Sequence, residues 1–399
     1  MRHDISSEAE GATVDARGAR RLRVARVYFH LEVGGIEKRL VDLLPRLDRS
    51  RFDLQLVCTR RRGALADELE NAGVPVRVCR HHRKLPTVLS ALKLARLFRR
   101  LDVDLVHGHG EAPAQIATLA ARWAGTPLVV ANFHNVGLFR ERGQLRRERR
   151  QAPQRDAVIH VSRRVREDYE ERVRPGAYQA RVIYNGVDVQ RFAAAPDAAR
   201  LDGLRAELQL GDGAPLLLKV ARLRRNKAHH DLFDAFREVL GQHPRALLLL
   251  AGDGHERGWV ERGIRERGLQ SSVRLLGRRG DVHDLYHLVD VNVVASHREG
   301  FSNVVLEAMA AGTPQVVTDV GGNSEAVGES GAARVVPARD PAALARELLR
   351  LLGDRELSAS MRGAARQRAA CFSVEEQVLR TEQLYLELAR RKGLAAARD

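Results

Sequence analysis

The sequence has few cysteines, few aromatic residues and no long apolar run, and each scarcity excludes a class of protein. Its three cysteines, Cys58, Cys79 and Cys371, are too few for a disulfide framework and lack the spacing of metal ligands. No stretch stays apolar over the roughly 18 residues that a membrane-spanning helix needs, and the first residues lack the apolar core of a secretion signal. We therefore expect a protein of a reducing, cytoplasmic compartment.

Aromatic residues make up only 5% of the chain, so its core must consist mainly of Leu, Val and Ala. A hydrophobic fraction of 44% with only 13 prolines favours a folded chain over a disordered one. The length of 399 residues accommodates two domains of ordinary size. Residues 1–21 are polar, and we expect them to form a disordered segment.

Acidic residues are outnumbered, because the net charge is +16 and nearly all of the excess is arginine. The excess reflects either a general compositional habit or attraction to an anionic surface such as lipid or nucleic acid. Residues 80–100 form a basic cluster with interleaved leucines, and residues 140–155 form a second basic cluster. Such helices can lie on the inner face of a membrane, or can pack their leucines inward as ordinary surface helices. We expect no nucleic-acid partner, because aromatic residues for stacking on bases are not interleaved with the basic ones.

Strand-like and helix-like patterns alternate through the chain, as is typical of doubly wound parallel sheets. The alternation breaks near residues 185–188 and restarts after an Ala-, Pro- and Asp-rich stretch. We therefore predict two similar α/β domains over 22–190 and 214–370, joined by a linker over 191–213. A C-terminal helix within 371–399 is expected to cross back to the first domain. Ligands are expected in the cleft between the two sheets.

The most informative segment of the chain runs from Glu299 to Glu307. The sequence predicts a buried strand over 291–295, a tight turn at Gly300 and a helix that Ser302 can cap. One carboxylate therefore lies at the carboxyl end of a strand, and the other lies about one turn into the next helix. The free N–H groups at the start of that helix suit a phosphate.

The second domain also supplies a pair of cations. Arg222 follows its first predicted strand and Lys227 precedes the next helix, so both lie near the carboxyl end of one strand. A guanidinium fork and an ammonium group suit a diphosphate, and no divalent metal is then essential. Combined with the two glutamates at a second strand end, this pair becomes a strong signal for an anionic ligand.

The first domain has glycines and histidines where its predicted strands end. Gly34 and Gly35 directly follow the first strand and open a helix, where a backbone can approach a phosphate or sugar closely. Such a pair can also be a simple turn. His109 and His134 lie at two later strand ends. A histidine there can be structural or functional, and two of them facing one cleft favour function.

These segments resemble glycosyltransferase family 4, the retaining enzymes of the GT-B fold. The resemblance runs from about Arg23 to the C-terminal helix. The matching segments, spread over both halves of the chain, are Gly34-Gly35-Ile36-Glu37, 104–107, 182–188, 221–223 with Lys227, 299–312 and 321–325. The resemblance implies two Rossmann-like domains that face each other across a cleft, the first binding the acceptor and the second the nucleotide-sugar.

The resemblance also implies roles for single residues. Arg222 and Lys227 would hold the donor diphosphate and stabilise its charge as it leaves, Glu307 would bind the ribose hydroxyls, and Glu299 and His134 would contact the transferred sugar. Gly35 would let the first domain's loop close, and a loop that starts at Gly277 would contact the base. The full set of expected donor contacts is Gly34, Gly35, Arg222, Lys227, Gly277, Glu299, Gly300, Phe301, Ser302, Asn303 and Glu307.

In that family the leaving phosphate is thought to take the acceptor proton on the same face of the sugar, which gives retention. Glu299 would then position the sugar and not attack it. The donor would be UDP- or GDP-linked, with no cofactor and no metal. Glu37 and His109 would contact the acceptor. We expect a glycan or lipid-linked glycan of bacterial lipopolysaccharide or another envelope polysaccharide; the alternative is a soluble small-molecule acceptor.

The chain departs from the family pattern at Ala221 and Ala228, where many members have glycine, so the cation loop carries two extra methyl groups. Two other functions are alternatives to sugar transfer. A hydrolase would use Glu299 and Glu307 as an acid–base pair, but it leaves Arg222 and the twin sheets unexplained. A non-enzymatic binder of anionic surfaces predicts that a Glu299→Ala variant behaves like the wild type.

Overall fold

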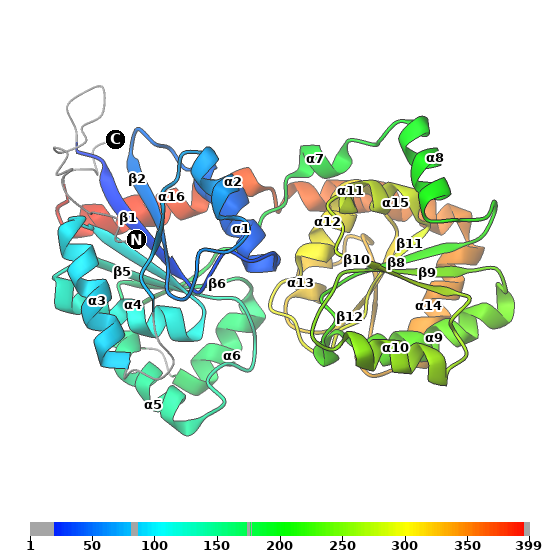
Figure 1. Cartoon of the computed structure of the whole chain (residues 1–399), viewed down its shortest axis with the longest axis horizontal. Coiled ribbons are helices and arrows are strands. Elements are labelled where there is room, and N and C mark those ends of the chain that lie inside the picture. Colours follow the sequence, from blue (N-terminus) through cyan, green and yellow to red (C-terminus); the bar gives the residue numbers. More distant parts are fainter. Residues whose placement is uncertain (1–19, 81–86, 174–175, 177, 395–399) are drawn as a thin grey trace, which may run out of the picture.

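The computed structural model shows two α/β domains side by side and describes residues 20–80, 87–173, 176 and 178–394 (Figure 1). Most of the segment expected to be disordered, 1–21, lies outside these residues. Residues 81–86 of the first basic cluster and the last residues, 395–399, also lie outside them.

The first domain is built on a seven-stranded parallel sheet in the order β3-β2-β1-β4-β5-β6-β7. Its strands are β1 (Leu22–Tyr28), β2 (Phe52–Cys58), β3 (Val76–Val78), β4 (Leu105–His109), β5 (Leu128–Phe133), β6 (Ala157–His160) and β7 (Gln179–Val182). Its helices are α1 (Gly35–Leu43), α2 (Ala66–Asn71), α3 (Thr87–Arg100), α4 (Glu111–Ala124), α5 (Arg142–Gln151) and α6 (Arg163–Val173), with short 3-10 turns at Leu44–Arg46 and Ala152–Gln154.

The second domain is built on a six-stranded parallel sheet in the order β10-β9-β8-β11-β12-β13. Its strands are β8 (Leu216–Val220), β9 (Leu247–Ala251), β10 (Val273–Gly277), β11 (Val291–Val294), β12 (Gln315–Thr318) and β13 (Arg334–Val336). Its helices are α9 (His229–Gln242), α10 (Arg257–Glu266), α11 (Val282–Leu288), α12 (Asn303–Ala311), α13 (Asn323–Val327) and α14 (Pro341–Gly353).

The strand order reverses at one place in each sheet, between β1 and β4 and between β8 and β11. In open α/β sheets, the crevice that opens beyond the carboxyl ends of the strands at such a reversal is the usual ligand site. The two crevices of this chain face each other across the domain boundary. The alternation of elements predicted from the sequence is therefore confirmed, and it positions the site.

The chain passes between the domains twice. Residues 191–213, expected to be a linker, are partly helical. They contain the end of α7 (Val189–Ala193) and all of α8 (Ala198–Glu207). Leu204 of α8 is buried against the second sheet. After α15 (Arg355–Ala370), α16 (Val374–Arg391) returns to the first domain (Figure 1). The returning helix buries Tyr385 in the core beside Phe52, with ring centroids 5.9 Å apart.

The two domains share one hydrophobic cluster. Phe133 of β5 and Val305 of α12 both belong to it. The Phe301 ring lies 5.0 Å from that of Tyr184 and 5.3 Å from that of Phe372. This aromatic contact joins the loop after β11 to the first domain and to the start of the return helix, so the domains are closed against each other.

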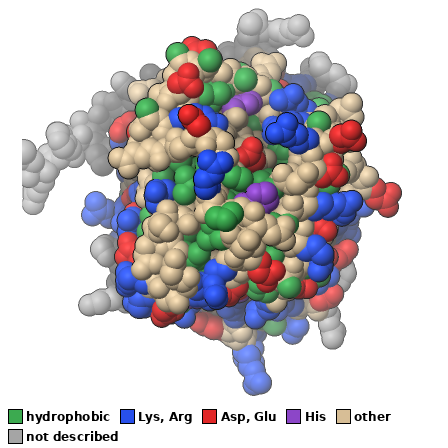
Figure 2. Space-filling view, turned by 90° about the vertical axis from the view of Figure 1, so that its right-hand side faces the viewer, with side chains coloured by type: hydrophobic (Ala, Val, Ile, Leu, Met, Phe, Trp, Pro, Cys, Tyr) green, Lys and Arg blue, Asp and Glu red, His purple; other side chains and the backbone are tan. Residues whose placement is uncertain are grey.

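The basic clusters differ in how their side chains pack. In α3, Leu94 and Phe98 are buried, whereas Leu89 and Leu92 are 43% and 37% exposed. In the second cluster, Arg155 is buried and forms an ion pair with Glu148, so part of that cluster is interior structure. On the far face of the second domain, basic and acidic side chains are interspersed (Figure 2). Within the described residues, no helix is long and apolar enough to cross a membrane.

Candidate active site

The cation pair lies where β8 ends. Arg222 precedes a short 3-10 turn, Arg225–Lys227, whose last residue is Lys227 and which leads into α9. Ala228 joins the turn to the helix with φ 45° and ψ 42°, a left-handed conformation that favours glycine. The departure from glycine at this position therefore costs backbone strain.

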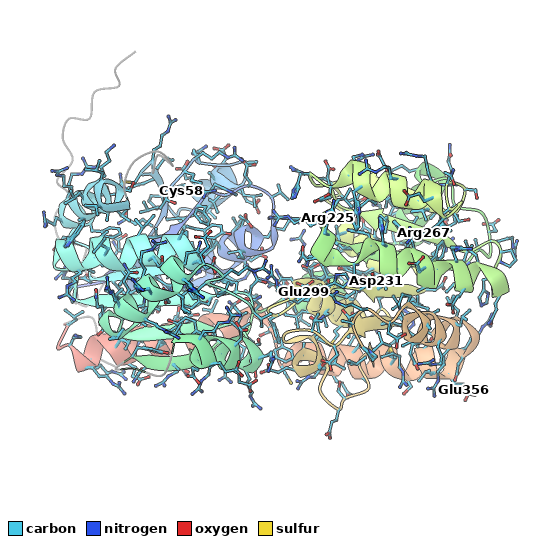
Figure 3. All side chains as sticks on the ribbon, turned by 90° about the horizontal axis from the view of Figure 1, so that it is seen from below. Cys58, Arg225, Asp231, Arg267, Glu299 and Glu356 are labelled. Carbon is cyan, nitrogen blue, oxygen red and sulfur yellow. The ribbon has the colours of Figure 1, made fainter. Side chains whose placement is uncertain are left out.

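The first glutamate lies at the end of β11. Glu299 Oε1 accepts hydrogen bonds from Lys227 Nζ at 2.5 Å and from Ser296 Oγ at 2.7 Å. The two loops are also joined by their backbones, because the N–H of His297 donates to the carbonyl of Asn226 at 2.9 Å. Figure 3 shows Glu299 at the boundary between the domains. The predicted neighbourhood of Lys227 and Glu299 is thus a direct contact.

The second glutamate lies on α12. The Tyr286 hydroxyl, which comes from α11, donates to Glu307 Oε2 at 3.1 Å and holds that carboxylate in place. Ser302 occupies the N-cap position of α12, but its side chain makes no capping hydrogen bond. The helix start therefore keeps backbone N–H groups for another acceptor, in line with the phosphate site expected there.

The glycine loop of the first domain meets these groups directly. Arg222 Nη2 lies 3.3 Å from Glu37 Oε2 and 3.3 Å from the carbonyl oxygen of Val33. A Cβ at Gly34 would lie only 1.3 Å from Arg222 Nη2, so this approach requires glycine. Asn303 Nδ2 donates to the carbonyl of Gly35 at 3.1 Å. The first domain's loop is thus closed over the cation pair.

A second contact between the domains involves His134. A Cβ at Gly300 would lie 1.9 Å from the carbonyl oxygen of His134, so the two loops touch backbone to backbone. Ser162 Oγ donates to the carbonyl of Gly300 at 3.0 Å. Phe301, expected near the donor, directs its side chain into the interdomain cluster, and only its backbone is left for a ligand.

The histidines of the first domain form a stack. The rings of His107 and His109 are 4.3 Å apart, and those of His109 and His134 are 5.5 Å apart. His109 is the last residue of β4, and its side chain is 2% exposed and lies inside the domain. Glu37 and His109, which were expected to contact the acceptor, are therefore both buried in this closed conformation.

The hydrogen bonds of the stack determine the tautomers. Arg26 Nη1 lies 3.2 Å from His109 Nε2, and a guanidinium can only donate, so Nε2 accepts. The proton of His109 is then on Nδ1, which lies 3.3 Å from His134 Nε2 and donates to it. A neutral His134 must carry its proton on Nδ1. Burial and the charge of Arg26 lower the pKa of His134 to about 4, so it is neutral near pH 7.

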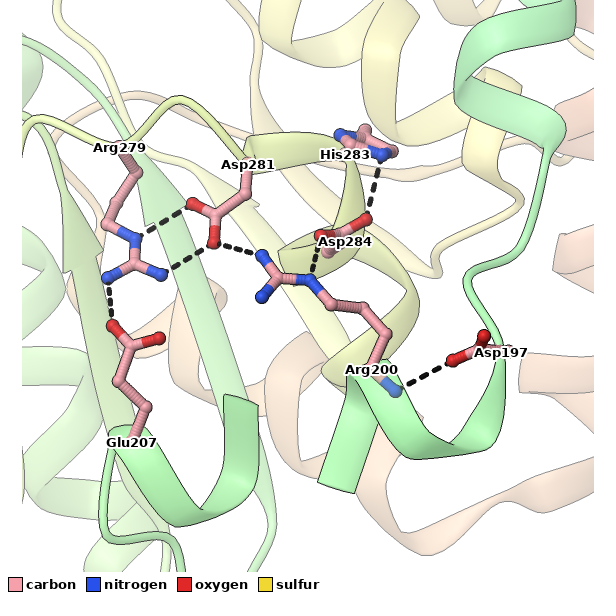
Figure 4. Close-up of polar contacts among 7 residues, drawn as sticks. All are labelled: Asp197, Arg200, Glu207, Arg279, Asp281, His283 and Asp284. Atoms are coloured by element: carbon pink, nitrogen blue, oxygen red, sulfur yellow. Dashed lines mark hydrogen bonds and ion pairs between the residues drawn. The ribbon is translucent and has the colours of Figure 1, made fainter. Parts of the chain in front are cut away.

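The loop that starts at Gly277 is held by ion pairs (Figure 4). Gly277 has φ 66°, and a Cβ there would meet open space. Arg279 pairs with Asp281 at 2.6 Å and with Glu207 at 2.5 Å, and Arg200 pairs with Asp281 at 2.8 Å. Helix α8 thus braces this loop, which the sequence could not indicate because Arg200 and Glu207 lie far away along the chain.

Some site groups were missed from the sequence. Lys219 of β8 is 2% exposed and donates to the carbonyl of Ala295 at 2.6 Å. Burial, helped by Lys227, lowers its pKa to about 7. The sequence feature that could have indicated Lys219 is a lysine within an otherwise apolar strand. No pattern pointed to Ser296 or Tyr286. Among the described residues, no group of His, Cys, Asp and Glu is arranged to hold a metal ion.

Two facing Rossmann-like domains, with Arg222 of the second in contact with the glycine loop of the first, have the architecture of the GT-B class of transferases. The chain belongs to glycosyltransferase family 4, because the profile "Glycosyltransferase Family 4" matches residues 33–191 and "Glycosyl transferases group 1" matches 202–368. It is therefore an enzyme that transfers sugars, and the hydrolase and the non-enzymatic binder are set aside.

Relatives and solved structures agree with this assignment. The D-inositol 3-phosphate glycosyltransferase of Corynebacterium urealyticum is 31% identical over 328 residues, covering 76% of this chain and 77% of that one. The Escherichia coli UDP-Gal:alpha-D-GlcNAc-diphosphoundecaprenol alpha-1,3-galactosyltransferase is 23% identical, covering 92% and 97%. The crystal structure of Anabaena HepE with UDP-glucose has a TM-score of 0.80 at 23% identity, covering 92% and 100%.

Proposed function

We propose that the chain moves a hexose from a UDP- or GDP-linked donor to a hydroxyl of a glycan or lipid-linked glycan, with retention of the anomeric configuration. One observation carries the proposal. Lys227 pairs with Glu299 at two neighbouring strand ends, and the Gly34-Gly35 loop of the opposite domain closes on Arg222, the other member of the cation pair. Cations on one side and carboxylates on the other suit the two ends of a nucleotide-sugar.

The donor diphosphate takes the place that Glu37 occupies on Arg222, so the domains open before the donor binds. Lys227 supplies the second positive charge. Glu307, held by Tyr286, accepts hydrogen bonds from the ribose hydroxyls. The base lies against the loop that begins at Gly277. Two fixed cations neutralise the leaving diphosphate, and on this proposal no divalent metal takes part.

In the transfer step, the bond between the anomeric carbon and the phosphate oxygen breaks while the acceptor oxygen bonds to the same face of that carbon. The acceptor proton passes to the leaving phosphate. Glu299 is held by Lys227 and Ser296, which suits a group that positions the sugar. His134, neutral and protonated on Nδ1, donates a hydrogen bond to a sugar hydroxyl.

The acceptor is proposed to be a lipid-linked or polymeric glycan of a bacterial envelope, handled at the cytoplasmic face of the membrane. The Escherichia coli relative is named for a diphosphoundecaprenol-linked acceptor. In α3, Leu89 and Leu92 are exposed beside Lys93 and Arg96, a combination suited to an anionic lipid surface. Sedimentation with anionic vesicles at physiological salt tests this, and a protein left wholly in the supernatant contradicts it.

A second candidate is a soluble small-molecule acceptor. It is favoured by the Corynebacterium relative, which is named for D-inositol 3-phosphate. The two candidates differ in the acceptor alone and share the donor site.

One experiment tests the proposal. Nucleotide-sugars are screened by thermal shift, and the best donor is then incubated with polyprenyl-linked glycans or with soluble polyols and their phosphates. Release of nucleoside diphosphate that depends on one acceptor class identifies it, and NMR of the product reads the anomeric configuration. An inverted product contradicts retention, and loss of activity in a metal chelator contradicts the metal-free step.

A further inference from the structure

A small, partly open cavity in the first domain is lined by positive charge without a counter-charge. It contains about 20 Å³ of free space between the sheet, α1 and α16, and is called here the Arg26 cavity. The polar side chains that matter for its chemistry are Arg26, Arg39, His107, His109, Asn132 and His134. None of the described side chains that line it is Asp or Glu. Two arginines therefore line one small space that offers them no carboxylate.

Arg26 is the more enclosed of the two. It lies on the interior strand β1, between β2 and β4, and is 1% exposed. Its Nη1 contacts His109, but its Nε and Nη2 have no hydrogen-bond partner among the described residues. The Tyr385 ring lies 5.6 Å from its guanidinium carbon, and Tyr385, whose hydroxyl also acts on the charge of Arg26, is a neutral neighbour that brings no counter-charge. A guanidinium removed from water with two idle nitrogens is costly unless an acceptor fills the space beside it.

Arg39 reaches the same cavity from α1. It is 8% exposed, and no hydrogen bond or ion pair joins it to a described residue. Asp42 and Glu307 act on its charge only from beyond ion-pair distance. The cavity thus carries two positive charges from two separate elements.

The histidines do not turn the cavity into a metal site. Arg26 donates to His109, which would have to give up that hydrogen bond to bind a cation. A metal would also bring further positive charge next to both arginines. In the part of the chain that the structure describes, these histidines do not form a metal-holding group. The unpaired Nε2 of His107 and the amide of Asn132 remain as groups that can face an anion.

We propose that the Arg26 cavity binds one small monatomic anion, of the size of chloride, between the guanidinium groups of Arg26 and Arg39. The free space is on the order of one or two water molecules, which excludes a sugar ring. His134 forms one wall, so the anion lies directly behind the proposed sugar position. The site depends on the fold of the first domain alone, and it stands even if the proposed transfer reaction fails.

Thermal unfolding of the full-length protein, without donor or acceptor, tests this. The probe is sodium chloride, compared with sodium gluconate at equal ionic strength, because gluconate is too large for the cavity. We expect a saturable rise of the unfolding midpoint by about 2–5 °C with chloride and none with gluconate.

The Arg26→Met variant keeps a long apolar side chain without charge and should lose the anion-specific rise. Arg39→Met should shift the half-saturating concentration upward about tenfold, and it serves if Arg26→Met does not fold. Arg265→Met, an exposed arginine on α10, should behave like the wild type. A wild type that responds equally to gluconate, or arginine variants that keep the full response, would overturn the proposal.

Discussion

Arg222 of the second domain pairs with Glu37 of the first, with Nη2 and Oε2 3.3 Å apart across the domain boundary. The two partners differ in burial, because the Glu37 side chain is 3% exposed and that of Arg222 is 38% exposed. The first domain thus places its own carboxylate on the guanidinium that is proposed to hold the donor diphosphate. On that proposal, the ion pair with Glu37 and the donor diphosphate compete for the Arg222 side chain.

Replacing Glu37 by glutamine should tighten nucleoside diphosphate binding. The variant removes the negative charge that competes for Arg222, and we expect a gain of about 3- to 10-fold in affinity, or roughly 1 kcal/mol. Isothermal titration calorimetry with UDP and GDP measures it. Glu32→Gln, which removes the partner of Arg61 on the same loop, is the matched control and should change nothing. Weaker diphosphate binding in Glu37→Gln would contradict the competition.

The two glycines of the loop should respond differently to alanine. A methyl group on Gly34 would overlap the Arg222 guanidinium, whereas one on Gly35 would lie 3.3 Å from Asn303 Nδ2. Because Arg222 is flexible, Gly34→Ala should fold normally but lower kcat/KM at least tenfold, about 1.4 kcal/mol. Gly35→Ala should stay within about threefold of the wild type. Equal losses in both variants would show that the contact with Arg222 is not what requires glycine.

Much of the fold and part of the site follow from local sequence pattern. The C-terminal helix expected within 371–399 is α16 (Val374–Arg391), and the strand expected over 291–295 is β11 (Val291–Val294), which leads into the loop that carries Glu299. Arg222 and Lys227 were predictable because they lie a few residues from one strand. Their roles remain predictions.

What could not be predicted depends on contacts between distant segments. The pairing of Glu37 with Arg222 joins residues of two domains, and local spacing carries no trace of it. His109 was expected at a strand end, and it is the last residue of β4, but its burial in a stack with His107 and His134 depends on β5 lying beside β4. Helix α8 was hidden by an Ala-, Pro- and Asp-rich stretch, which resembles a linker until the burial of Leu204 is known.

The buried ion pair of the second basic cluster should be essential for stability. Glu148 and Arg155 are both fully buried, and Tyr169 and Gln115 complete the hydrogen bonds of the carboxylate. Glu148→Gln leaves a buried guanidinium without its counter-charge and should lower the free energy of unfolding by about 3–5 kcal/mol. Urea denaturation measures the loss.

The matched control for that variant is Glu167→Gln. Glu167 pairs with Arg164 at 3.5 Å on the surface of α6, with both side chains more than half exposed. Its loss should change the free energy of unfolding by less than about 0.5 kcal/mol. Similar small effects for both variants would mean that the buried pair contributes no more than a surface pair.

Buried histidines should make the protein less stable in mild acid. Burial lowers the pKa of His134 to about 4, and those of His160 and His229 to about 3. Below about pH 6.5 the unfolded chain takes up protons that the native state refuses, so stability falls as the pH falls. Each histidine should cost roughly 1 kcal/mol between about pH 7.5 and about pH 5.5.

Urea unfolding at the two pH values measures this loss. His160, whose ring nitrogens have no partner among the described residues, packs beside Phe133 and Tyr169. The His160→Phe variant should therefore fold and lose its share of the pH dependence. A free energy of unfolding that stays constant over this range would contradict buried, neutral histidines.

The central claim is that Arg222 and Glu307 grip opposite ends of one nucleotide-sugar. Calorimetric titration of the wild type, Arg222→Ala and Glu307→Ala with the nucleotide-sugar that binds best, and with its nucleoside diphosphate, tests it most directly. Each variant should bind both compounds at least about 30-fold more weakly, or roughly 2 kcal/mol. Undiminished affinity in both variants would place the donor elsewhere and contradict the account.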